Sequence, residues 1–252
     1  MRSGAVALGR DRIQTLVLAA VAYLPLLAND MGRVAADTKA YLYLDPGRLL
    51  AGAPYMWQPE VAMGTVTHQN IGYLWPVGPF FWLGEAIGLP DWITQRLWLG
   101  SVLLAAGLGM RWFLRTLGWR GAALLVSALA YMLSPYLLNY VDRHSVILLP
   151  WAGLPWLMGL TVRALRTPGW RHAAIFGLVT LTVGGVNASS LLLVGIGPVA
   201  WLAWCAVEGS APWRRVVGTA ARIGLAFAAT GTWWMVGLAI QSRYGLPTLH
   251  LT

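Results

Sequence analysis

Long apolar segments dominate this sequence and restrict what it can fold into. Seven of them come close to, or exceed, the length of about 20 residues that an α-helix needs to cross a bilayer. They are Ile13–Ala28, Thr94–Met110, Gly121–Asn139, Ser145–Val162, His172–Val186, Ser189–Val207 and Val217–Gln241. The segments are continuous and lack the alternation typical of transmembrane β-strands, so helices are expected. Only 11% of the residues are charged, against roughly 25% in soluble domains. The sequence therefore predicts an all-α integral membrane protein with about seven transmembrane helices.

The arginines predict how these helices alternate across the membrane. With a cytoplasmic N-terminus, seven spans leave four segments inside, each with three arginines. The segments are Met1–Arg12, Arg111–Arg120, Arg163–Arg171 and Glu208–Arg222. They hold 12 of the 18 basic residues, in agreement with the positive-inside rule. We expect a multi-pass protein of the plasma (inner) membrane, and this distribution argues against nucleic acid as the reason for the net charge of +9.

One further apolar block, Leu74–Leu89, is ambiguous. It is short and contains Pro76, Pro79 and Glu85. Counting it as a span would reverse every later loop and place the arginine-rich segments outside. We therefore expect it to be interfacial or re-entrant, so that residues 29–91 form one long extracytoplasmic excursion with interfacial helices.

The expected organisation follows from these segments. A cytoplasmic tail at 1–12 precedes a first span at 13–28, which is read as a retained anchor because no A-x-A cleavage pattern follows it. The outer loop at 29–91 and six further spans within 94–241 come next. Residues 242–252 then begin another outer segment. Because the chain stops there without a terminal domain, we expect it to be the N-terminal part of a longer protein.

Polar groups able to do chemistry are concentrated in the first outer loop. It contains Asp30, Asp37, Lys39, Asp45, Glu60 and His68. Asp37 lies close to the expected membrane surface, where partial desolvation favours a general base. The structural alternative is that Asp37 caps a short helix over Thr38–Leu44. Asp30 marks the end of the first span but is close enough to share a site with Asp37.

The other acidic residues of this loop have structural explanations. Asp45 is followed by Pro46, the pattern of a helix N-cap with proline at the first helical position. Glu60 and Glu85 are expected to be solvated or interfacial.

Two polar clusters on the outer side are candidates for substrate binding. His68, Gln69 and Asn70 stand beside Tyr73 and Trp75, and hydrogen-bonding side chains next to aromatic rings suit a carbohydrate, although they suit a capped turn almost as well. The second cluster consists of Asp142, Arg143 and His144. Its arginine is able to hold a phosphate or to pair with Asp142.

No motif indicates a metal or cofactor. The sequence lacks H-x-x-x-H, D-x-D and any Cys/His pair at ligand spacing. The 29 glycines form no phosphate-binding loop but are scattered through the expected helices, where small residues allow close helix packing. Charged residues within the expected spans are scarce, which weakens a transporter hypothesis.

Three segments carry a resemblance to a known family. They are ADTKAYLYLDP (Ala36–Pro46), GTVTHQNIGYLWPVGPF (Gly64–Phe80) and GGVNASS (Gly184–Ser190). With them the chain resembles the N-terminal part of GT-C superfamily membrane glycosyltransferases, specifically the actinobacterial (mycobacterial) alpha-(1→3)-arabinofuranosyltransferases of the D type. The resemblance extends over essentially the whole chain. Members of that family are several times longer, with extracytoplasmic carbohydrate-binding modules.

The resemblance implies a reaction that composition does not reveal. Such enzymes transfer arabinofuranose from a decaprenyl-phosphate carrier to cell-wall arabinan on the periplasmic face. The donor linkage is beta and the product alpha, so a single inverting displacement is implied, with a carboxylate of the first outer loop as general base. Asp37 is the best match for this base and Asp30 the second. Arg143 or Lys39 would stabilise the departing phosphate.

Three alternatives remain open at this stage. A polyprenyl-phosphate-mannose-dependent mannosyltransferase of the same superfamily would differ in its donor. A transporter of lipid-linked saccharides would need intramembrane polar residues and inverted repeats, whereas the sequence offers only Asp91 and Arg96 near the start of one span. A non-catalytic membrane scaffold would tolerate replacement of each outer carboxylate.

Overall fold

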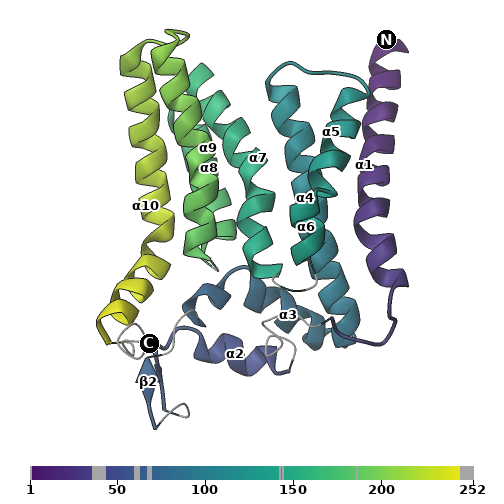
Figure 1. The fold of residues 1–252 in the computed structure, drawn as a ribbon, viewed down its shortest axis with the longest axis vertical. Coiled ribbons are helices and arrows are strands. Elements are labelled where there is room, and N and C mark those ends of the chain that lie inside the picture. The colour runs from purple at the N-terminus through teal and green to yellow at the C-terminus, as the bar shows by residue number, and fades with distance from the viewer. Residues whose placement is uncertain are drawn as a thin grey trace.

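A computed structural model describes residues 2–35, 44–59, 63–66, 70–141, 143, 145–185 and 187–244. Within them, long helices run side by side and short elements gather at one end of the bundle (Figure 1). The long helices are α1 (Arg2–Ala28), α4 (Asp91–Thr116), α7 (Ser145–Arg166), α8 (Trp170–Gly184), α9 (Ala188–Val207) and α10 (Trp213–Tyr244). Two shorter helices, α5 (Ala123–Met132) and α6 (Pro135–Tyr140), follow one another beside α4.

Each expected span overlaps helix within the part of the chain that the structure describes. Among the described residues, six helical segments are long and apolar enough to cross a membrane. The remaining one, α8, has 15 residues, which corresponds to a helix about 22 Å long. The exact number of spans therefore stays a prediction, whereas the helical membrane-protein class is confirmed.

The expected span Gly121–Asn139 is not one continuous helix. It is divided into α5 and α6 at Leu133 and Ser134. Pro135 has no backbone N–H and disfavours helical geometry in the residue before it. Ser134 accordingly adopts φ −59° and ψ 146° and caps α6, with its hydroxyl oxygen accepting from the backbone N–H of Leu137 at 3.4 Å.

The excursion between α1 and α4 is built from short elements. They are α2 (Pro46–Gly52), β1 (Trp57–Gln58), β2 (Thr65–Val66), the 3-10 helix η2 (Asn70–Leu74) and α3 (Val77–Ala86). The two strands pair antiparallel, Trp57 opposite Val66 and Gln58 opposite Thr65, an addition to the expected all-α fold. At 10 residues, α3 spans only about 15 Å and lies across the end of the bundle beside α2 (Figure 1).

Several arginine-bearing helix ends meet at the opposite end of the bundle. Arg115 of α4 pairs with Asp11 of α1, and Arg166 of α7 donates to the backbone carbonyl of Thr116. These contacts bring the C-terminal ends of α4 and α7 and the N-terminal part of α1 together at this end. Which end faces the cytoplasm stays a prediction.

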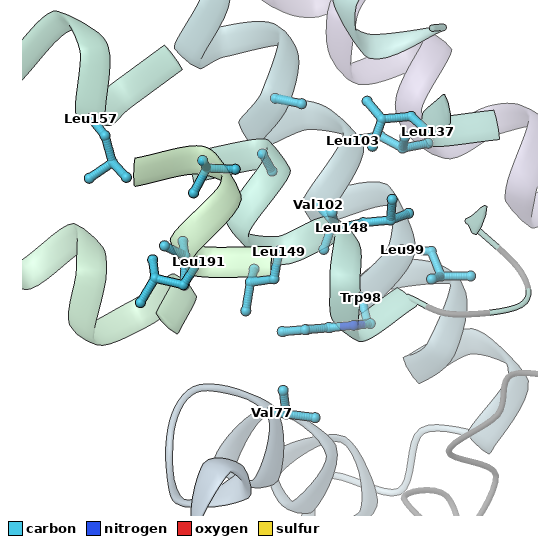
Figure 2. Close-up of a cluster of buried hydrophobic side chains, with 14 of the residues drawn as sticks. Val77, Trp98, Leu99, Val102, Leu103, Leu137, Leu148, Leu149, Leu157 and Leu191 are labelled. Carbon is cyan, nitrogen blue, oxygen red and sulfur yellow. The ribbon is translucent and has the colours of Figure 1, made fainter. Parts of the chain in front are cut away.

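The core joins the bundle to the short elements. Buried side chains from α3, α4, α6, α7 and α9 form one continuous cluster (Figure 2). Phe80 and Phe81 of α3 contact Trp98 of α4, with ring centroids 5.1 and 6.0 Å apart. Gly84 of α3 lies so close to Thr94 that an added Cβ would be 2.5 Å from its methyl carbon. The outer elements are thus packed onto the beginning of α4.

A glycine on each of the two central helices, α4 and α7, allows a tryptophan of the other helix to pack closely against it. A Cβ on Gly159 of α7 would lie 2.1 Å from Cζ3 of Trp112 in α4, and a Cβ on Gly109 of α4 would lie 2.5 Å from Nε1 of Trp156 in α7. The two tryptophan rings stack at 5.4 Å, and Trp156 donates to the carbonyl of Ala105 at 3.0 Å. Small residues at a helix interface allow this close approach, so the packing role expected for the glycines is confirmed here.

This packing makes Gly159→Ala a test of the interface. We expect the substitution to destabilise the protein by about 1–3 kcal/mol, because the rigid Trp112 ring has to move away from the added methyl group. Gly195→Ala in α9 is the matched control, since nothing lies within 4 Å of its added Cβ. Melting temperatures of the purified variants in detergent measure the difference, and equal values for the two would contradict the proposed packing.

Candidate functional site

The outer excursion begins with a turn that contains Asp30. This residue has φ 44°, which is uncommon for a residue other than glycine and favours Asn and Asp. The backbone N–H of Arg33 donates to its carbonyl oxygen at 3.2 Å. The carboxylate is exposed at the end of α1, as expected for a residue that marks the end of the first span. Its catalytic role stays a prediction.

The backbone that follows this turn is held by α4. The side-chain amide of Gln95 donates through Nε2 to the carbonyl of Ala35 at 3.0 Å and accepts through Oε1 from the N–H of Ala35 at 2.7 Å. Arg96 donates through Nη2 to the carbonyl of Arg33 at 3.4 Å. Ala35 directly precedes residues 36–43. This segment, which contains Asp37 and Lys39, lies outside the described residues.

Asp45 has the structural role predicted for it. Its Oδ1 accepts from the backbone N–H of Arg48 at 2.9 Å, and Pro46 occupies the first turn of α2. This satisfies one of the amide groups that a helix N-terminus leaves unpaired.

A cleft runs between α2 and the β1–β2 hairpin. It has a volume of about 540 Å³, and its lining includes Asp45, Arg48, Tyr55 and Trp57. The side chains of Tyr55 and Trp57 are 69% and 58% exposed. Gly64, with φ +104°, leaves room for the Trp57 ring, because a Cβ there would lie 2.3 Å from Cζ2. The cleft therefore combines aromatic surface with charged and polar groups.

The expected carbohydrate cluster divides in the structure. His68 and Gln69 lie outside the described residues, and Asn70 begins η2. Tyr73 is 1% exposed and belongs to the core, so its ring presents no free face for a sugar and the stacking role predicted for it is wrong. Trp75 is 44% exposed, and its Nε1–H donates to Thr182 of α8 at 3.2 Å. Trp75 thus remains a candidate at the rim of the bundle.

The second polar cluster is represented by Arg143. It lies in the turn after α6, where its backbone N–H donates to the carbonyl of Tyr140 at 3.2 Å, and its side chain is exposed. Asp142 and His144 lie outside the described residues. Arg143 remains free of a carboxylate partner within the part of the chain that the structure describes, so its role as a phosphate-binding residue stays a prediction.

A smaller cavity lies where η2 meets α9 and α10. It has a volume of about 160 Å³, and Asn187, Ser189, Trp234 and Gln241 are among its lining residues. Asn187 caps α9, with its Oδ1 accepting from the N–H of Ser190 at 2.8 Å. The GGVNASS segment therefore shapes this cavity and begins α9.

Sequence reasoning missed the functional interest of Gln95. The sequence marks Arg96 only as a scarce charge near the start of a span and gives no sign of its contact with the outer loop. The available signal was a Gln-Arg pair at the start of an otherwise apolar helix. Among the described residues, no group of three potential metal-ligating side chains is present.

Comparison with known proteins identifies the family. The model of the family "Alpha-(1->3)-arabinofuranosyltransferase, N-terminal GT-C domain" matches residues 20–251. The chain belongs to this family. It is 35% identical over 227 residues to the alpha-(1->3)-arabinofuranosyltransferase of Mycobacterium tuberculosis (strain ATCC 25618 / H37Rv), covering 88% of this chain. It is 32% identical over 237 residues to that of Mycolicibacterium smegmatis (strain ATCC 700084 / mc(2)155), covering 92% of this chain.

Solved structures agree with this assignment. The cryo-EM structure of the arabinofuranosyltransferase AftD from mycobacteria superposes with a TM-score of 0.81 at 32% identity, covering 92% of this chain and 18% of that one. A cryo-EM structure of an AftD mutant gives the same TM-score at 31% identity. The chain spans 16% of the length of each curated relative. It therefore corresponds to the N-terminal membrane part of the family.

Asp45→Ala tests the capping role of this carboxylate. We expect α2 to lose about 1 kcal/mol of local stability, because the amide of Arg48 loses its acceptor. Hydrogen exchange of the α2 amides, followed by mass spectrometry, should be faster than in the wild type. Asp45→Asn retains a capping oxygen and should exchange at nearly the wild-type rate. Equal protection in the alanine variant would contradict this role.

Proposed function

We propose that the full-length protein transfers arabinofuranose from a polyprenyl-phosphate donor, decaprenyl-phosphoryl-arabinose, to a cell-wall arabinan or related glycan at the periplasmic face. This chain contributes the membrane part of the active site. The observation that carries the proposal is the family match over residues 20–251, which includes all three resemblance segments of the sequence.

In the proposed reaction, the Asp37 carboxylate removes the proton from the attacking hydroxyl of the acceptor. The acceptor oxygen then forms a bond to the anomeric carbon of arabinofuranose as the bond to the carrier phosphate breaks. Attack from the opposite face inverts the beta linkage to alpha. The polyprenyl phosphate leaves as an anion, so it needs no protonation, and a cation such as Arg143 or Lys39 stabilises its charge.

Two features support an outer-face site. The arginine-bearing helix ends lie at the end of the bundle opposite α2 and α3, which the positive-inside rule assigns to the cytoplasm. The cleft between α2 and the hairpin offers exposed aromatic rings beside polar groups, a combination suited to a glycan. Membrane lipids surround the bundle, and the donor reaches the outer loop from them.

The general base is tested in the full-length protein with Asp37→Asn. We expect kcat to fall by about 100- to 10,000-fold, the usual contribution of a general base, while the protein still folds and binds donor. Asp91→Asn is the matched control, since it makes the same change on an exposed carboxylate in the first turn of α4, outside the cleft, and should retain activity. Unchanged turnover in Asp37→Asn would rule out Asp37 as the base.

The orientation is tested with single cysteines on a Cys205→Ser background, which removes the chain's one cysteine. Met63 at the hairpin is fully exposed, and Trp119 between α4 and α5 is 53% exposed. In intact cells we expect a membrane-impermeant maleimide to label M63C and not W119C, because only the hairpin faces outward. Labelling of W119C alone would reverse the proposed topology.

A further inference from the structure

Two polar side chains of α4 are buried at the end of the bundle that carries the outer loop. Gln95 is 0% exposed and Arg96 is 4% exposed, in the second turn of a helix whose other buried residues are mostly apolar. Burying a glutamine amide or a guanidinium in such surroundings is unfavourable unless its hydrogen bonds and charge are compensated. The contacts that these two side chains make therefore indicate what they do.

Gln95 forms with the chain after α1 the pair of hydrogen bonds that a neighbouring β-strand would form. Its donor and its acceptor are both used on the same residue, the backbone of Ala35. Because the contact is made with backbone atoms, it fixes the position and direction of the chain at this point whatever the side chain of residue 35. The chain then continues into residues 36–43, the segment that contains Asp37.

Arg96 holds the same stretch two residues earlier, through the carbonyl of Arg33. Its Nε is buried without a hydrogen-bond partner. Among the described residues, no carboxylate forms an ion pair with Arg96. A buried guanidinium with an unused donor and no counter-charge stabilises any negative group that comes close to it.

We propose that Gln95 and Arg96 are positioning residues for the transfer reaction. Gln95 fixes the backbone of Ala35, two residues before Asp37, and Arg96 adds a buried positive charge against the carbonyl of Arg33, where it favours the ionised form of a carboxylate near it. This inference rests on the proposed function, in which Asp37 is the base. It extends the reaction machinery from the outer loop into the membrane helix α4.

A glutamine and an arginine also form hydrogen bonds at the opposite end of the bundle, but these bonds do not involve the outer loop. Gln14 of α1 donates to the carbonyl of Gly121 at 3.4 Å. Arg111 of α4 donates to the carbonyl of Asp11 at 3.2 Å and to the hydroxyl of Thr15 at 2.9 Å. These bonds connect α1 to α4 and to the turn before α5, away from the outer loop, so Gln14 and Arg111 are matched controls for the loss of a part-buried glutamine or arginine.

The experiment measures kcat and the KM for the donor in the full-length protein for Gln95→Leu, Arg96→Gln and Arg96→Lys, with Gln14→Leu and Arg111→Gln as controls. We expect kcat to fall by about 100-fold in Gln95→Leu and Arg96→Gln, the size of effect that a displacement of about 1 Å produces, with an unchanged KM. Arg96→Lys keeps the charge and should recover part of the loss. The controls should retain the wild-type kcat.

Two kinetic outcomes would overturn the proposal. An increased donor KM at unchanged kcat would assign Arg96 to direct binding of the donor phosphate. Equal kcat values in the test and control variants would show that Gln95 and Arg96 have a structural role only. Absence of transfer by the wild-type protein would instead count against the proposed function.

Hydrogen exchange of the peptide containing Ala35 tests the anchoring without activity. Faster exchange in Gln95→Leu than in the wild type and Gln14→Leu supports it, because the amide of Ala35 loses its acceptor. An unchanged rate contradicts it. If Gln95→Leu does not fold, Gln95→Met replaces it in the same comparison, because its unbranched side chain of similar length also removes the acceptor for this amide.

Discussion

Close contact between α4 and α7 is the interaction on which the rest of the structure depends. Apolar side chains gain little by leaving lipid for a helix interface, so membrane helices associate through packing and hydrogen bonds. Here each helix offers a glycine to the tryptophan of the other, Gly159 to Trp112 and Gly109 to Trp156. Trp156 also donates to a backbone carbonyl of α4. This interface fixes α4 at the centre of the bundle.

The position of α4 decides how the outer loop is supported. Its first turns pack against α3 through Thr94 and Trp98, and its second turn binds the backbone that follows α1. The loop is therefore attached to the central helix α4 at both its beginning and its end. A transfer reaction requires its reacting groups to be held in place by rigid elements, because small displacements of these groups lower the rate.

The sequence predicted some parts of this site well and others poorly. Asp45 was recognised as a cap because capping depends only on residues next to it in the chain. The loop sequence predicts Tyr73 as a sugar-stacking residue, yet the structure buries it, since an aromatic residue in a loop carries no local sign of which face it presents. Gln95 escaped notice because its partner, Ala35, lies 60 positions away in the chain.

Length and hydrophobicity in the sequence determined that the chain is a helical membrane protein and where most of its long helices lie. These properties are local, because a helix in a bilayer satisfies its backbone hydrogen bonds within itself. Only the tertiary structure decided which helices pair and which side chains of the outer loop stay accessible. Those outcomes depend on contacts between segments far apart in the chain, which no local pattern encodes.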